Sequence, residues 1–294
     1  MDKVVVFGGS GFIGSHLADA LTENGYDVVI FDETYSPYIQ ENQTMVSGDI
    51  LNQKSVQSVV RGARYVYHFA GIADIQKSSI SPWQTMNINI MGTCNILEAC
   101  MKAGTDRFVF ASSMYVYSEV GSFYRVSKQS CEKIIEEYAK EFDLKYTILR
   151  FGSVYGPRAN QFNSISKMLN QAFTEGRIVC NGDGEEVRQY IHVSDAVQEC
   201  VNILDEKYRN KHLALIGNET LTLHQLMMII KEIFDHNIEI EYLPRENIHH
   251  YRITPYSYKP IKALKLISKS YHDLGQGLLE LFHEMEKQEL QISR

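Results

Sequence analysis

The stretch Gly8-Gly-Ser-Gly11-Phe-Ile-Gly14 decides how the first part of this chain folds. It follows the apolar run Val4–Phe7 and opens a segment whose apolar residues recur at helical spacing. Three glycines between a strand and a helix are typical of a loop that holds the pyrophosphate of a dinucleotide. Gly8 permits the tight turn, Gly11 lets the backbone approach a phosphate, and Gly14 lets the helix pack closely on the strand. The loop therefore predicts a dinucleotide-binding unit.

An acidic residue, Asp32, ends the next predicted strand, residues 28–31. A carboxylate about 20 residues after the glycines is expected to hold the hydroxyls of the adenosine ribose. It would also repel a 2′-phosphate, and no lysine or arginine lies between Asp32 and Gln53 to offset that repulsion. We therefore expect NAD rather than NADP. The alternative is an aspartate that only occupies a solvated turn.

The first half of the chain alternates short apolar runs with helical patterns. A parallel, doubly wound sheet is typical of this order, so we predict a Rossmann-type α/β fold. The length, 294 residues, permits about two lobes. We expect the dinucleotide-binding domain at 1–156, with 183–212 returning to it, and a smaller α/β substrate lobe at 157–182 and 213–294. The predicted buried strands are 4–7, 28–31, 65–69, 108–111 and 147–151, with a long helix at 122–141.

Composition excludes several classes of protein. A net charge of −7 argues against nucleic acid as a main partner. The five cysteines form no C-x-x-C pair, so we expect free thiols in a reducing compartment and no metal site. The adjacent His249 and His250 do not share a helix face and are expected at a solvated surface. With no apolar run of about 18 residues and no leader before the first strand, we expect a cytoplasmic protein without a membrane span.

Three residues suggest proton-transfer chemistry. Ser113 ends the predicted strand at 108–111, and Tyr124 and Lys128 follow at i and i+4, on one helix face. A free tyrosine titrates near pH ~10, but a neighbouring ammonium and a positive nicotinamide ring favour the phenolate. Lys128 could also hold the nicotinamide ribose, and Ser113 could position a reacting hydroxyl. Alone, such a pair is more often a surface feature, and the glycine loop upstream favours the catalytic interpretation.

With these motifs the chain resembles the extended short-chain dehydrogenase/reductase family, in its nucleotide-sugar epimerase/dehydratase branch, over about residues 3–200. The resemblance implies a catalytic triad of Ser113, Tyr124 and Lys128. It also implies that Ser153, Arg188 and Arg252 contact the substrate, with Arg188 on the diphosphate of a nucleotide sugar. The cofactor contacts that it implies are Gly8, Gly11, Phe12, Ile13, Asp32, Asp49, Ile50, Ala70, Gly71, Tyr124 and Lys128.

The chain departs from the family pattern at several positions. Family dehydratases carry Asp-Glu after the catalytic hydroxyl residue, and Met114 and Tyr115 stand there instead, which argues against 4,6-dehydration. Ser153 replaces a family asparagine, and Arg252 is an even choice for a second phosphate contact. The family's usual tail signatures are absent. For Arg188, the alternative to a contact with the diphosphate is a structural salt bridge.

The function that follows is an NAD-dependent nucleotide-sugar epimerase, most simply acting at C4 through a keto intermediate. The alternative is a reductase of nucleotide 4-keto sugars, which would use the same residues. A less favoured alternative is an NAD-sensing binding protein that has lost catalysis. The resemblance also implies a homodimer built from the helices near 84–103 and 122–141, although burial within one chain would explain their apolar faces equally well.

Overall fold

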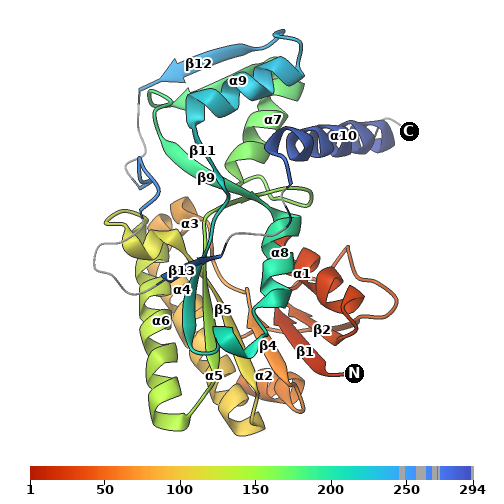
Figure 1. The fold of residues 1–294 in the computed structure, drawn as a ribbon, viewed down its shortest axis with the longest axis vertical. Helices are drawn as coiled ribbons and strands as arrows, with labels where there is room; N and C mark the ends of the chain where they lie inside the picture. Colours follow the sequence, from red (N-terminus) through yellow and green to blue (C-terminus); the bar gives the residue numbers. More distant parts are fainter. Residues whose placement is uncertain (245–248, 256–262, 267–269, 271, 293–294) are drawn as a thin grey trace.

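A computed structural model describes residues 1–244, 249–255, 263–266, 270 and 272–292 of the chain. It contains a large parallel sheet covered by helices on both faces and a second lobe above the carboxyl ends of the strands (Figure 1). The predicted Rossmann-type α/β fold is confirmed. Within the described residues, no helix combines the length and the apolar character that a membrane span requires.

The central sheet has eight parallel strands in the order β13-β10-β6-β5-β4-β1-β2-β3. The chain therefore builds outward from β1 in both directions, which is the doubly wound arrangement. All five predicted strands are present, and the strands β3, β10 and β13 were not expected. The strands are β1 (Lys3–Phe7), β2 (Asp27–Asp32), β3 (Thr44–Ser47), β4 (Tyr65–His68), β5 (Arg107–Ser113), β6 (Tyr146–Phe151), β10 (Lys211–Leu215) and β13 (Ala263–Leu266).

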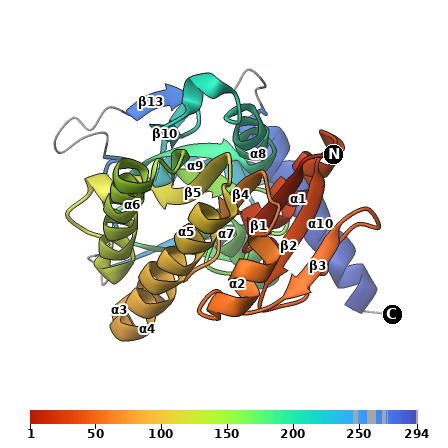
Figure 2. The same ribbon diagram turned by 90° about the horizontal axis from the view of Figure 1, so that it is seen from below.

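Helices cover the two faces of this sheet in separate groups (Figure 2). On one face, α1 (Phe12–Glu23) packs beside α8 (Val193–Asn202) over a core that includes Val4, Leu17 and Val28. The other face carries α2 (Gln53–Val60), α5 (Gly92–Ala103) and α6 (Ser122–Phe142). The predicted helix at 122–141 is thus confirmed as α6. Shorter helical segments join these elements: α3 (Ile75–Ile80), α4 (Pro82–Met86), the π-helix η1 (Asn87–Met91), η2 (Met114–Tyr117) and η3 (Glu206–Tyr208).

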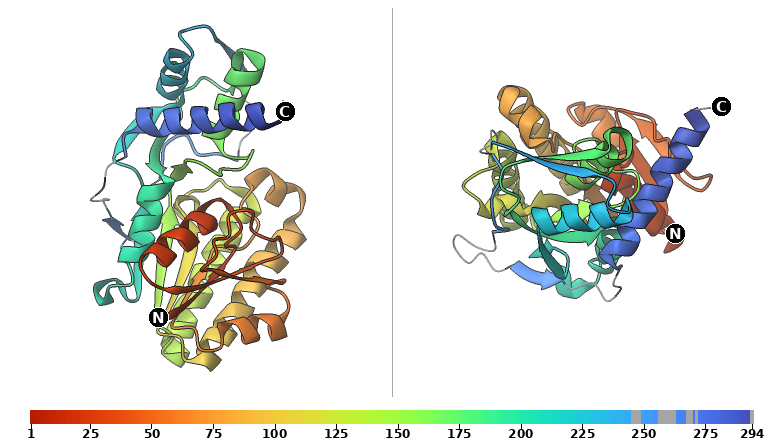
Figure 3. Two further views of the ribbon diagram at one scale, coloured as in Figure 1. Left: turned by 90° about the vertical axis from the view of Figure 1, so that its right-hand side faces the viewer. Right: turned by 90° about the horizontal axis from the view of Figure 1, so that it is seen from above.

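The second lobe has a core of its own, to which Ile165, Leu226 and Leu278 contribute (Figure 3). Helices α7 (Ser164–Glu175), α9 (Leu223–Ile233) and α10 (Leu274–Ile292) pack around the parallel pair β8 (Arg177–Asn181) and β12 (Glu239–Leu243). A three-stranded sheet connects this lobe to the central domain. Its strands, in the order β11-β9-β7, are β11 (Glu219–Thr222), β9 (Val187–His192) and β7 (Ser153–Tyr155).

The expected boundaries of the two lobes need a correction. Strand β10 runs to Leu215 and pairs with β6, so the division at residue 212 cuts a strand of the central sheet. The tail also returns once more, because β13 pairs with β10 at the edge. The short run Ala263-Leu-Lys-Leu266 carries little apolar pattern of its own. Its strand conformation depends on the partner strand, which a local pattern does not reveal.

The glycine loop shows how tightly α1 is held against β1. A Cβ atom at Gly14 would lie 2.1 Å from the carbonyl oxygen of Gly8, and one at Gly8 would lie 2.5 Å from the backbone nitrogen of Ala70. Gly8 also has a φ of +81°, a conformation that side chains rarely adopt. The roles predicted for these two glycines in a tight turn and in close packing are therefore confirmed.

We predict that Gly14→Ala lowers the free energy of unfolding by about 3 kcal/mol, because backbone rather than a flexible side chain blocks the new methyl group. Urea denaturation followed by circular dichroism measures the loss. Glu23→Ala, at an exposed position of the same helix, is the control and should change stability by less than about 0.5 kcal/mol. Equal losses in both variants would contradict the packing argument.

Candidate active site

The glycine loop ends in a helix terminus whose backbone can receive an anion. Helix α1 begins at Phe12, and its N-cap is Gly11, so no side chain caps the first turn. The first N–H groups of a helix lack partners within the helix and carry partial positive charge, so they attract phosphate. A Cβ at Gly8 or Gly14 would clash with backbone and displace this loop. The residues present therefore fit the pyrophosphate of NAD.

Asp32 lies at the end of β2, beside this loop. Its carboxylate accepts hydrogen bonds from the backbone nitrogens of Ser10 and Thr34, each at 3.1 Å. These bonds fix the carboxylate next to the glycine loop and leave it half-buried. The geometry fits a contact with ribose hydroxyls better than a purely solvated turn.

The other expected cofactor contacts lie on the neighbouring strands. Ala70 and Gly71 follow β4, which pairs with β1 in the sheet, and Ala70 meets the glycine loop directly. Gly71 has a φ of +137° and lies against the side-chain amide of Asn89. Asp49 is exposed and Ile50 is buried beyond β3, where Ile50 packs on Gly92. The structure thus brings the predicted cofactor residues to one end of the sheet.

Ser113, Tyr124 and Lys128 come together at the same end. Ser113 ends β5 and hydrogen-bonds the hydroxyl of Tyr124, which lies on the first turn of α6. The Lys128 ammonium lies 5.8 Å from the centre of the Tyr124 ring and donates to the carbonyl oxygen of Ala111 at 2.7 Å. The sequence therefore identified three residues that the fold does bring into contact.

Burial dominates the pKa values of this group. It raises the pKa of Tyr124 to about 12, although the hydrogen bond from Ser113 opposes that change. Burial also lowers the pKa of Lys128 to about 8, and Cys131 and Glu132 oppose it. The protein's own groups therefore favour the neutral tyrosine, because removing a charged group from water is costly. The phenolate that we expect from Lys128 together with the positive nicotinamide ring stays a prediction for the protein with bound cofactor.

The expected substrate residues gather along β9. Ser153 begins β7, which pairs with β9, and Arg188 lies on β9 itself. The guanidinium of Arg188 lies 4.3 Å from the centre of the Tyr251 ring and donates to the carbonyl oxygen of Arg252 at 3.3 Å. Arg252 is exposed and forms a 2.8 Å ion pair with Asp183. The two arginines are neighbours, but only Arg252 has an acidic partner in the described part of the chain.

Sequence reasoning missed an aromatic wall between these arginines and Tyr124. The Tyr115 ring lies 6.2 Å from the Tyr124 ring and 4.5 Å from the Tyr251 ring, centre to centre. The Tyr115 hydroxyl lies 2.6 Å from Nδ1 of His250. His250 is exposed, as expected, but it is also a contact of the candidate site. In the sequence, the signal that could have placed His250 at the site was its position two residues before Arg252.

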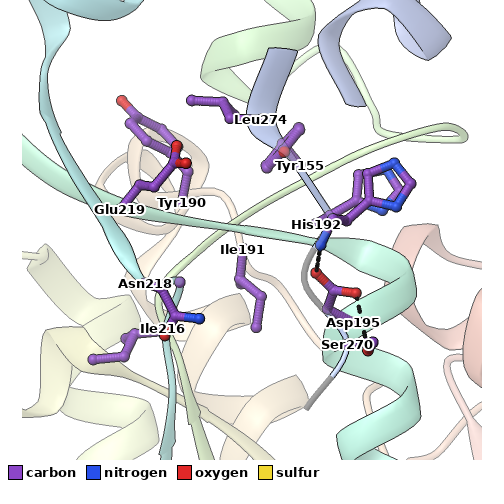
Figure 4. A pocket seen from close by; sticks show the side chains of 12 residues that line it. Tyr155, Tyr190, Ile191, His192, Asp195, Ile216, Asn218, Glu219, Ser270 and Leu274 are labelled. Atoms are coloured by element: carbon purple, nitrogen blue, oxygen red, sulfur yellow. Dashed lines mark hydrogen bonds between the residues drawn. The ribbon is translucent and has the colours of Figure 1, made fainter. Parts of the chain in front are cut away.

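A separate pocket lies along β9, and its lining includes neither Ser113 nor Tyr124 (Figure 4). Here Asp195 accepts hydrogen bonds from the Ser270 hydroxyl at 3.3 Å and the His272 backbone at 3.0 Å. His192 and His272 stack with ring centres 4.0 Å apart and an 11° angle, close to Glu280. In-plane lone pairs of nearly parallel rings do not converge on one ion, so this group anchors the tail rather than forming a metal centre.

Comparisons with known proteins identify the family to which the chain belongs. The family model described as "NAD dependent epimerase/dehydratase family" matches residues 4–217. A UDP-N-acetyl-alpha-D-glucosaminuronate decarboxylase of Bacillus cytotoxicus is 27% identical over 97% of this chain and 98% of its own. Many more curated proteins match, so the likeness does not rest on one relative.

Solved structures give the same result. The UDP-glucose 4-epimerase of Thermotoga maritima, solved with UDP-glucose, is 28% identical with a TM-score of 0.87, covering 97% of this chain and 99% of that one. The UDP-glucuronic acid 4-epimerase of Bacillus cereus, solved with UDP-glucuronic acid and NAD, shares the fold, with 24% identity, a TM-score of 0.86 and coverage of 97% and 99%. The chain belongs to the NAD dependent epimerase/dehydratase family.

Proposed function

We propose that this protein is an NAD-dependent nucleotide-sugar epimerase that inverts C4 through a keto intermediate. The observation that carries the proposal is the meeting of Ser113, Tyr124 and Lys128 at the same end of the sheet as the glycine loop. The UDP sugars named for the decarboxylase and for the Thermotoga maritima epimerase favour a UDP sugar as substrate. Met114 and Tyr115 supply no carboxylate beside Ser113, which favours epimerisation over dehydration.

Each residue of the triad has a separate task in this proposal. Tyr124 takes the proton from the sugar O4 and later returns it. Ser113 donates to or accepts from the same oxygen and holds C4 in position. Lys128, held in place by the Ala111 carbonyl, attracts negative charge toward the Tyr124 oxygen and reaches the ribose next to the nicotinamide. NAD, when bound, supplies the acceptor and donor of the C4 hydride.

The remaining candidates hold the two ends of the ligands. Gly8, Gly11, Phe12 and Ile13 present backbone to the pyrophosphate of NAD, and Asp32 holds the adenosine ribose. Asp49, Ile50, Ala70 and Gly71 line the cofactor on its other side. At the far end, Arg188 binds the diphosphate of the sugar nucleotide, with Ser153 and Arg252 beside it.

We predict that Tyr124→Phe lowers kcat about 10³-fold and leaves NAD affinity unchanged, because the lost hydroxyl transfers the proton. Conversion between 4-epimers of UDP-glucose, UDP-N-acetylglucosamine and UDP-glucuronic acid is followed by NMR, and cofactor binding by calorimetry. Tyr138→Phe is the matched control on α6, because the Tyr138 hydroxyl bonds only Glu98 among the described contacts. It should keep parental turnover.

Further measurements on nucleotide-sugar substrates separate the alternative functions. Steady conversion without net change in the absorbance of reduced cofactor supports epimerase activity. Stoichiometric loss of NADH with a 4-keto sugar would instead show a reductase, and CO₂ release from a UDP-uronic acid would show a decarboxylase. If the NAD-loaded protein turns over none of these sugars, the proposed enzyme function is wrong and the sensor alternative gains support.

We also infer that the protein acts as a homodimer in the cytoplasm. Ile80, Trp83 and Met91 are large apolar residues with 75%, 77% and 51% of their surface exposed, on α3, α4 and η1. Such residues near α5 and α6 favour contact with a second copy. All five cysteines are free thiols, which suits a reducing compartment.

We predict that Trp83→Glu converts the dimer to a monomer in sedimentation velocity, because a buried unpaired carboxylate opposes association. Phe162→Glu, at a position 71% exposed near the second lobe, is the control and should leave the sedimentation coefficient unchanged. A parent protein that sediments as a monomer at all concentrations would contradict the homodimer.

A further inference from the structure

A buried ion pair, Glu132 with Arg150, lies next to the candidate triad. Glu132 lies on α6, and Arg150 lies on β6. The Arg150 Nε donates to Glu132 Oε1 at 2.9 Å, and its NH2 group donates to Oε2 at 2.6 Å. Only 3% of Glu132 and 1% of Arg150 is exposed to solvent. The two side chains thus form a two-pronged, charge-assisted contact in a dry environment.

The pair also binds the segment that carries Ser113. The Ser112 hydroxyl donates to Glu132 Oε1 at 2.5 Å. Arg150 donates to the Tyr117 hydroxyl and lies 4.6 Å from the centre of that ring. Ser112 and Tyr117 flank the stretch from Ser113 to Val116, so one ion pair holds both ends of it.

Strand geometry links this contact to the direction of Ser113. Ser112 and Arg150 are register partners on the neighbouring strands β5 and β6. Successive side chains of a strand point to opposite faces. Holding Ser112 on the α6 face therefore fixes the orientation of the end of β5, where Ser113 hydrogen-bonds the Tyr124 hydroxyl.

The second link runs through α6. Glu132 follows Lys128 by four residues, so the two side chains occupy the same face of the helix on adjacent turns. Anchoring Glu132 to β6 fixes the rotation of α6 about its axis. That rotation sets the positions of both Tyr124 and Lys128 relative to Ser113.

Stability alone does not explain the pair. Burying two charges costs desolvation energy, and well-packed apolar residues often stabilise a protein as well or better. Such a pair is better explained by what it positions. The net charge of the pair is zero, and of its two residues the Glu132 carboxylate alone raises the pKa of Lys128.

We propose that Glu132 and Arg150 are positioning residues for the proton transfer, which hold Ser113 and α6 at the spacing that the reaction needs. This inference rests on the proposed function. A change in the charge of the pair also acts on the polar groups around it. These groups are Lys128, Glu136, Tyr146, Tyr117 and His212.

The charges of the two residues act in opposite directions on the triad. Burial raises the pKa of the Glu132 carboxyl, but Arg150, together with hydrogen bonds from His212 and Ser112, lowers it to about 2, so the carboxylate is charged throughout the working range. Glu132→Gln leaves one extra positive charge, which favours the Tyr124 phenolate and the neutral Lys128. Arg150→Met leaves one extra negative charge and has the reverse effect.

We predict that Glu132→Gln moves both limbs of the pH profile of kcat downward by about one unit and that Arg150→Met moves both upward. The double variant Glu132→Leu/Arg150→Met keeps the net charge and should fold and bind NAD. Its kcat should still fall at least about tenfold, because the spacing is lost. Glu132→Asp keeps the carboxylate, so its kcat should fall less than that of the double variant.

A second measurement does not need turnover. The phenolate absorbance of Tyr124 is obtained as the difference between each variant and its matching Tyr124→Phe protein, in the NAD-loaded state. Its titration midpoint should shift in the same directions as the pH profiles. If the parent has no epimerase activity, the proposed function fails, and this titration still tests the ion pair.

Arg107→Met/Glu206→Gln is the control, because it removes another buried arginine's ion pair, at the opposite end of β5. It should leave kcat and the titration midpoint of Tyr124 unchanged. A parental kcat in the folded Glu132→Leu/Arg150→Met protein would overturn the proposal. So would equal losses of kcat in that variant and in the control.

Discussion

The contact between the glycine loop and the ends of β1 and β4 is the constraint on which the rest of the site depends. Because Gly8 and Gly14 have no side chains, helix α1 approaches β1 closely enough for its first turn to lie at the candidate site. The same approach places Ala70 against the loop and sets where β4 ends. A larger residue would move the helix terminus away from the place where phosphate must bind.

Parallel strands extend this constraint across the sheet. Because all eight strands run in the same direction, their carboxyl ends meet at one edge, where Asp32 ends β2 and Ser113 ends β5. Helix α6 then returns along the sheet and adds Tyr124 and Lys128 from its first turns. Residues separated by more than ninety positions in the chain thus come to the same edge of the sheet through strand pairing.

The sequence predicted what local patterns determine. Glycine spacing, apolar strands and the i, i+4 pair identified the fold, the cofactor loop and the triad, because each depends on residues close together in the chain. The strand character of 263–266 and the boundary at β10 were missed, because both depend on pairing with distant strands. The wall formed by Tyr115 and Tyr251 was missed for the same reason: its two rings come from segments that meet only in three dimensions.

The pKa values of Tyr124 and Lys128 show what the protein's own groups contribute to the proton transfer. Burial separates the pKa of Tyr124, about 12, from that of Lys128, about 8, so the enclosed pair favours the neutral tyrosine. A proton acceptor in such a site must gain its charge from a cationic partner that arrives with the ligands, and the proposed nicotinamide is one. A rigid support for this pair should therefore carry no net charge of its own, since a fixed charge would alter the balance before the cofactor does. The mutual neutralisation of Glu132 and Arg150 meets that requirement while still fixing the strand and the helix that hold the triad.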